Sequence, residues 1–107
     1  MAAIGFVNGT IEKGFVGQLK TLSIRATIEI RTNPSKNGDV QPDFRAYSEG
    51  VEIGAGWVRI GEASGKPYVS LTLAAPEFGP RRIYANLGRA AGEDGEDGYA
   101  IIWNPDN

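Results

Sequence analysis

The chain has 107 residues, which fits one domain with a modest hydrophobic core. It contains no cysteine and no histidine, which excludes disulfides, thiolate chemistry, cysteine-ligated zinc and histidine general bases. The net charge is −2, with 8 acids against 11 bases in residues 1–90 and the other 5 of the 13 acids after them, a balance too small to indicate a nucleic-acid footprint.

The first half of the chain predicts β-strands. "GFVNGTIEKGFVGQL" is typical of two short strands around a three-residue loop that ends at Gly14, which supplies a positive φ. In "LSIRATIEIR" every second residue from Leu22 to Ile30 is apolar, which predicts a half-buried strand. "DFRAY" predicts a shorter strand with Phe44 and Ala46 on one face.

The stretch "VEIGAGWVRIGEASGKP" contains Gly-x-Gly and Gly-Lys, so it has to be tested as a nucleotide-binding loop. A dinucleotide fingerprint needs its third glycine two residues before Gly61, and a P-loop needs serine or threonine where Pro67 stands. Both motifs therefore fail. We predict instead one strand, Val51–Ile60, in which Gly54 and Gly56 share a face and leave a groove or a bend at a barrel corner.

The same alternation continues to the C-terminal part of the chain. The residues expected to face inward are Val69, Leu71 and Leu73, then Ile83, Ala85 and Leu87, then Tyr99, Ile101 and Trp103, while Val51, Ile53, Ala55 and Trp57 are expected to share the face opposite the two glycines. Residues 33–42 and 88–98 are predicted flexible loops, and a single helical turn fits Ala74–Gly79 or Arg89–Gly92. Seven to eight short strands in a single domain, residues 1–107, predict an all-β fold, either a small antiparallel barrel or a sandwich.

The sequence also indicates where in the cell the protein is expected. No apolar run is long enough to span a bilayer, and the N-terminal stretch lacks the basic and apolar regions of a signal peptide. We therefore expect a cytoplasmic protein that does not insert into a membrane.

Five stretches carry a family resemblance: "PDFRAY", "VEIGAGW", "PYVSLTLAAPEF", "RIYANL" and "YAIIW", in this order. Together they resemble an uncharacterised alphaproteobacterial family of proteins of about a hundred residues, a domain of unknown function often carried on plasmids and integrated conjugative elements. The chain has "LAAPEF" where the family has "LDDPSF", so Ala74 and Ala75 replace two acids, and it carries a longer "GRAAGEDGEDG" insert. The resemblance implies no catalytic residues. It implies that the protein acts together with the DNA of a mobile element or counteracts a defence system of the host.

Three features that resemble sites are interpreted as structural. Asp43 and Arg45 flank Phe44, and we expect an ion pair on the outer face. Trp57 and Trp103 are expected in the core. The acidic residues do not have the spacing of a calcium-binding EF-hand loop, so a solvated loop is expected and cation binding at residues 93–97 is left open; they are Glu93, Asp94, Glu96 and Asp97.

The remaining side chains favour binding over catalysis. With no histidine to activate a hydroxyl and no Ser-x-x-Lys pattern, we predict no enzyme, no cofactor, and no catalytic or metal-binding residue. The candidate interaction surface consists of outward polar and aromatic residues: Arg45, Tyr47, Arg59, Arg82, Tyr84 and Asn86. The leading hypothesis is a non-catalytic interaction module that binds a protein partner, or a second copy as a homodimer, as an accessory of a mobile element. The alternative is a single-stranded DNA or RNA binding protein that uses an Arg/Tyr strand face.

Overall fold

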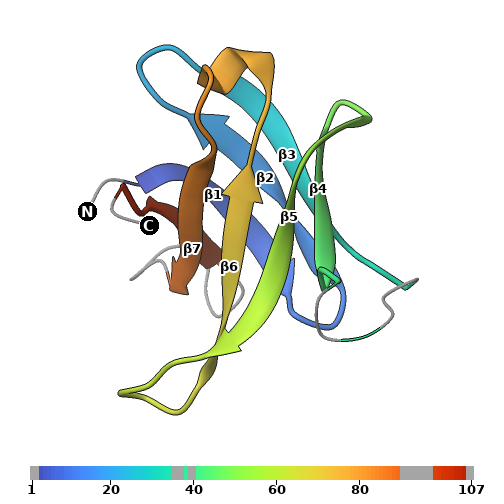
Figure 1. Cartoon of the computed structure of the whole chain (residues 1–107), viewed down its shortest axis with the longest axis vertical. Coiled ribbons are helices and arrows are strands. Elements are labelled where there is room, and N and C mark those ends of the chain that lie inside the picture. Colours follow the sequence, from blue (N-terminus) through green and yellow to red (C-terminus); the bar gives the residue numbers. More distant parts are fainter. Residues whose placement is uncertain (1–2, 35–37, 39–40, 90–97, 106–107) are drawn as a thin grey trace.

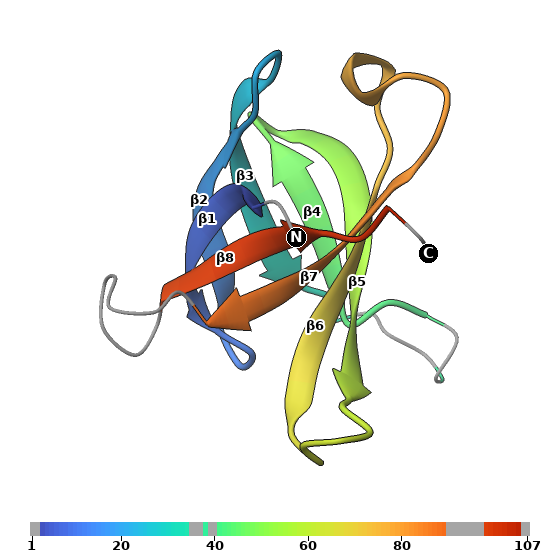
Figure 2. The same cartoon turned by 90° about the vertical axis from the view of Figure 1, so that its left-hand side faces the viewer.

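The computed structural model describes residues 3–34, 38, 41–89 and 98–105, and within them the chain forms eight antiparallel strands. These are β1 (Ala3–Thr10), β2 (Gly14–Lys20), β3 (Arg25–Thr32), β4 (Phe44–Ser48), β5 (Val51–Ile60), β6 (Pro67–Leu73), β7 (Ile83–Arg89) and β8 (Gly98–Trp103), with a short 3-10 helix η1 (Pro76–Phe78) before β7. Each strand pairs with the next, and β8 pairs back with β1, so the sheet closes into a barrel (Figures 1 and 2). The all-β prediction is confirmed, and of its two forms the barrel is the correct one.

Every strand contributes side chains to the interior of the barrel. Nearly all the buried apolar residues form one cluster, consistent with an eight-stranded barrel that is just wide enough to be filled by side chains. Three aromatic rings close the end at which the even-numbered strands begin. Phe15 packs on Phe44 with ring centroids 6.0 Å apart, and on Tyr99 edge to face at 5.3 Å. We call the opposite end, where η1 lies, the η1 end.

The glycines of β5 lie on its inner face. Gly54 is opposite Ala46 and Leu73, and Gly56 is opposite Phe44 and Leu71, all of which are buried. A Cβ atom on Gly56 would lie 2.9 Å from Leu71 Cδ2 and 3.5 Å from Phe44 Cβ. The two glycines therefore make room for larger interior side chains, and the structural interpretation of this stretch is confirmed.

The face predicted for the rest of β5 is correct for Ala55 and Trp57, which lie opposite the glycines, but a β-bulge makes it wrong for Val51 and Ile53. The register shifts between Ala46 and Tyr47, and this makes Ile53 an extra residue on β5. Ile53 is buried, whereas Val51 is exposed and the half-buried Trp57 alternates with the inward Gly56 and so faces outward. Trp57 is thus not a core residue.

Two other expected core residues lie at the η1 end and are exposed. Leu22 precedes β3 and is 106% exposed. Trp103 pairs with the buried Ala85, so it is on the inner side as predicted, but β8 has passed its last β1 partner at Ile102 and the indole remains 42% exposed. The other inward predictions for β6, β7 and β8 are confirmed, with Ile83 and Tyr99 only partly buried.

Two of the predicted turns are confirmed, and one predicted loop is shorter than expected. Gly14 has a φ of 93°, as the predicted hairpin loop requires, and η1 lies within the predicted helical turn Ala74–Gly79. β7 continues through Arg89 and β8 begins at Gly98, so both strands enter the range predicted as loop 88–98. Residues 35–37, 39–40 and 90–97, including the acidic cluster weighed for cation binding, lie outside the described residues. In the described part of the chain, no helix has the length and apolar character of a membrane span.

Candidate binding surface

The outer sides of β4 to β7 form one continuous surface, which we call the β4–β7 face. Its side chains alternate with buried ones along each strand, and they are Arg45, Ala55, Trp57, Arg59, Tyr68, Ser70, Thr72, Tyr84 and Asn86. The strand register places them in cross-strand rows: Arg45 with Ala55, Thr72 and Tyr84, then Trp57 with Ser70 and Asn86, then Arg59 with Tyr68. Small residues thus occupy the middle of the face, and large aromatic and basic residues surround them.

The most prominent aromatic residues lie on a hairpin that extends beyond its neighbours. β4 pairs with β5 only up to Gly56, and β7 pairs with β6 only from Ser70, so residues 57–69 form an arm, visible at the bottom of Figure 1. On this arm the Arg59 guanidinium carbon lies 5.9 Å from the centre of the Trp57 ring, within cation–π range. Arg59 also lies directly across from Tyr68, which is 36% exposed.

The charges around β4 are partly neutralised. Arg45 Nη1 lies 3.0 Å from Glu52 Oε2, in an exposed ion pair between β4 and β5. Asp43, which we expected to pair with Arg45, instead accepts a hydrogen bond through Oδ2 from the backbone N–H of Val58 at 2.8 Å. Asp43 therefore ties the base of the arm to the start of β4.

Tyr47 lies on β4 beside the β4–β7 face, where β4 pairs with β3. The guanidinium carbon of Arg31 lies 4.7 Å from the centre of its ring, and Arg31 Nη2 lies 3.1 Å from Glu29 Oε1. The Tyr47 ring is therefore covered by an arginine that is itself paired with a glutamate.

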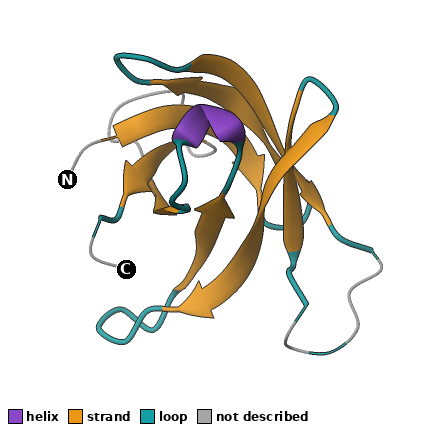
Figure 3. Ribbon diagram, turned by 45° about the horizontal axis from the view of Figure 1, so that its top comes forward, coloured by secondary structure: helices purple, strands orange, loops and turns teal. Residues whose placement is uncertain are grey.

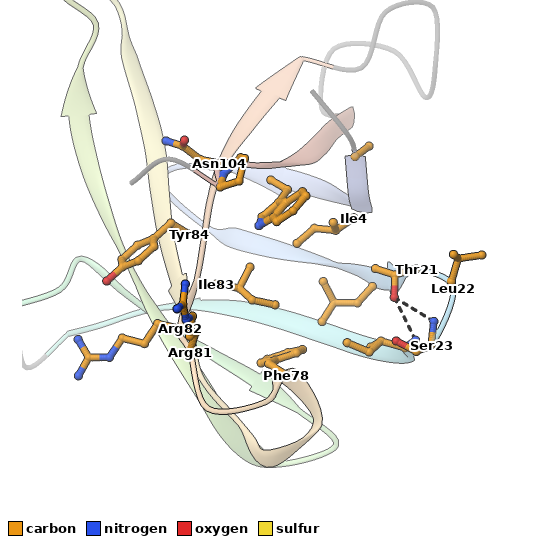
Figure 4. A pocket seen from close by; sticks show the side chains of 15 residues that line it. Ile4, Thr21, Leu22, Ser23, Phe78, Arg81, Arg82, Ile83, Tyr84 and Asn104 are labelled. Atoms are coloured by element: carbon orange, nitrogen blue, oxygen red, sulfur yellow. Dashed lines mark hydrogen bonds between the residues drawn. The ribbon is translucent and has the colours of Figure 1, made fainter.

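The structure brings together four of the six sequence-predicted residues: Arg45, Arg59, Tyr84 and Asn86. Arg82 lies elsewhere, in the segment before β7, where it borders a cavity at the η1 end together with Arg81 (Figure 4). The sequence interpretation missed Trp57 and Tyr68. Tyr68 precedes the inward Val69, so strict alternation from that residue would have placed it outside. Trp57 was missed because it was expected in the core, although it lies opposite the inward glycines.

The chemistry of this face suits contact. The described residues contain no buried polar or charged side chain, and they contain no group of three or more acids that could hold a metal ion. What the face offers is apolar ring area, guanidinium donors and small hydroxyl groups on a closed sheet.

Comparison with known proteins gave a family but no characterised relative. Neither the curated proteins nor the solved structures contain a match to the chain. One family model matches residues 3–106, which is nearly the whole chain and includes every described strand. The chain therefore belongs to the family described as "Protein of unknown function (DUF736)".

Proposed function

We propose that the protein is a non-catalytic binding module that holds another protein on its β4–β7 face. The observation that carries this proposal is the gathering of Trp57, Tyr68, Tyr84 and two arginines on one side of the barrel. Tryptophan, tyrosine and arginine are the residues most enriched at protein interfaces and at their energetic hot spots.

The arrangement of large and small residues also supports this proposal. Ala55, Ser70 and Thr72 keep the centre of the face low, so a segment of the partner can lie between the arm and Tyr84. The closed sheet holds these side chains in place before binding, which reduces the entropy lost on association. The family resemblance adds the context: an accessory protein of a bacterial mobile element, or of its contest with host defence, in the cytoplasm.

The test compares a face variant with a matched variant elsewhere. We expect R59E/Y68A to lose the partner that copurifies with the wild-type protein from its native host, and K20E, on the outer side of β2, to retain it. The interaction is then measured with the purified pair, and sedimentation of the wild type alone shows whether a second copy is the partner. A partner held equally by all three proteins contradicts a role for this face.

Single-stranded nucleic acid is the second candidate ligand, because Arg59 lies over Trp57 and beside Tyr68. Such a group offers stacking surfaces for bases and a cation for the backbone. Fluorescence anisotropy with a labelled oligonucleotide at two salt concentrations tests this function. We expect binding that weakens steeply with salt and is lost in R59E/Y68A, and no binding at low salt eliminates it.

A further inference from the structure

The two ends of the barrel are closed differently. Phe15, Phe44 and Tyr99 fill one end, whereas at the η1 end a cavity of about 1110 Å³ opens. η1 lies across this end (Figure 3), and Phe78 forms part of the cavity wall. The cavity is comparable with the upper end of the usual range for small-molecule sites, about 300–1,000 Å³.

The wall of this cavity is apolar and incompletely covered. Ile4 from β1, Phe78 from η1 and Ile83 from β7 come together around it (Figure 4), and each is only partly buried against the core. Trp103 lines it as well and is 42% exposed. A ligand with an apolar body would remove this surface from water, which is favourable by about 25 cal/mol per Å².

The charges at this end point to an anion. Arg81 and Arg82 border the cavity, and no acid is among its described lining residues. A second cavity, of about 750 Å³, adjoins the first and shares Leu19, Ser23, Ile24 and Phe78 with it. Its charged lining residues are Arg25, Glu49, Glu52 and Glu77. The charged residues that line the first cavity are therefore all basic, those that line the second are mostly acidic, and only the first complements a negative ligand.

We propose that the cavity beside Arg81 and Arg82 binds a small organic anion with an apolar body, of the class of medium-chain carboxylates. The apolar chain lies against Ile4, Ile83 and Trp103, and the carboxylate accepts hydrogen bonds from the guanidinium groups at the border. This site shares Tyr84 with the β4–β7 face, but it does not depend on the protein-binding role of that face and stands if that role fails.

The fluorescence of Trp103 can be used to measure ligand binding in this cavity. The chain has two tryptophans, and Trp57 is on the β4–β7 face, so W57F leaves one reporter in the cavity wall. We expect decanoate, below its micellar concentration, to shift the Trp103 emission to shorter wavelength and to saturate. Decyltrimethylammonium, which has the same tail and the opposite charge, should bind at least about tenfold more weakly, a difference of 1.4 kcal/mol.

Charge variants locate the anion. We expect R81E/R82E to weaken decanoate binding by about tenfold or more, and R25E, in the lining of the second cavity only, to change it by less than about twofold. Circular dichroism checks that each variant is folded, and calorimetric titration of the wild type gives the affinity without any substitution. Equal affinity for the two detergent-like probes, equal loss in R25E, or no saturable binding to the wild type overturns the proposal. So does a wild-type dimer that excludes decanoate, because a second copy then covers the cavity.

Discussion

Gly54 is one of the residues at which the sheet has no room for a side chain. An added Cβ atom would fall on the carbonyl oxygen of Thr72 and lie 2.8 Å from Leu73 Cδ2, so the backbones of β5 and β6 would have to separate. We expect G54A to lower the free energy of unfolding by about 1–3 kcal/mol, measured by urea denaturation. Gly88 in β7 is the matched control, because its Cβ would lie 3.5 Å from Ile102 Cγ1, an ordinary contact. Similar losses in G54A and G88A would contradict this assignment.

Asp43 is a second single residue whose contribution to stability can be tested, through one hydrogen bond. Its carboxylate accepts the N–H of Val58, a residue 15 positions away and beyond the last β4–β5 pair. We expect D43A to cost about 1–2 kcal/mol of unfolding free energy, because it leaves a part-buried donor without this acceptor. D43N keeps an acceptor oxygen and should recover most of the loss. If D43N is as unstable as D43A, the contribution comes from charge and not from this hydrogen bond.

At the scale of elements, the β5–β6 arm has to protect its own edges. A closed barrel has no edge strands, but this hairpin extends past β4 on one side and past β7 on the other. The hydrogen bond from Gly61 N to Lys66 O sets the ladder, so the neighbouring pair Ile60–Pro67 directs its backbone groups outward. Pro67 has no N–H to offer on that edge. Together with the Asp43 hydrogen bond, it limits pairing with another chain.

This protection predicts the behaviour of P67V. The substitution adds an outward N–H at the start of β6 without removing a ladder hydrogen bond, so we expect stability within about 0.5 kcal/mol of the wild type and more self-association. Light scattering over a range of protein concentrations measures the change. P105V, where the proline follows the last strand, is the control and should remain like the wild type. More association in both variants would point to a general loss of solubility and not to the edge.

The alternation of apolar and polar residues correctly predicted which side chains face inward in strands whose pairing is uninterrupted. Leu71 and Leu73 face inward as expected because β6 has partners on both sides along that part of its length. Alternation failed at Ile53, where a bulge reverses the pattern, and it gave the side of Trp103 but not its exposure, because β8 extends past its β1 partner. Neither the bulge nor the unpaired end of β8 is indicated by the residues around it in the sequence. Both are decided by the register of a second strand.

The sites were less predictable than the strands for the same reason. The aromatic–arginine group on the arm depends on the pairing of Arg59 with Tyr68, which only the hairpin register supplies. The cavity at the η1 end joins Ile4, Phe78 and Trp103, which come from the beginning, the later middle and the end of the chain. Barrel closure brings them together, and single-sequence periodicity does not indicate which strand ends will meet.

At the scale of the molecule, closure should make the barrel unfold as one unit. β1 pairs with β8, so strands near both ends of the chain have two partners each. The single-tryptophan variants W57F and W103F place one reporter at the end of β8 and one at the base of the arm. Because both residues belong to the same closed ladder, removing one strand would leave interior side chains of its neighbours exposed to water.

We therefore expect Trp103 in W57F and Trp57 in W103F to report the same urea dependence as far-UV circular dichroism measured on the same variant. Coincident transitions from different probes are the mark of a two-state domain, and a small single domain usually meets that test. Tyr68, Ser70 and the rest of β6 cannot leave without uncovering Leu71 and Leu73, which are fully buried. A Trp57 transition at lower urea than the circular dichroism of W103F would instead show that the arm separates first. The β4–β7 face would then be a movable surface, and binding at it would have to include the cost of ordering the arm.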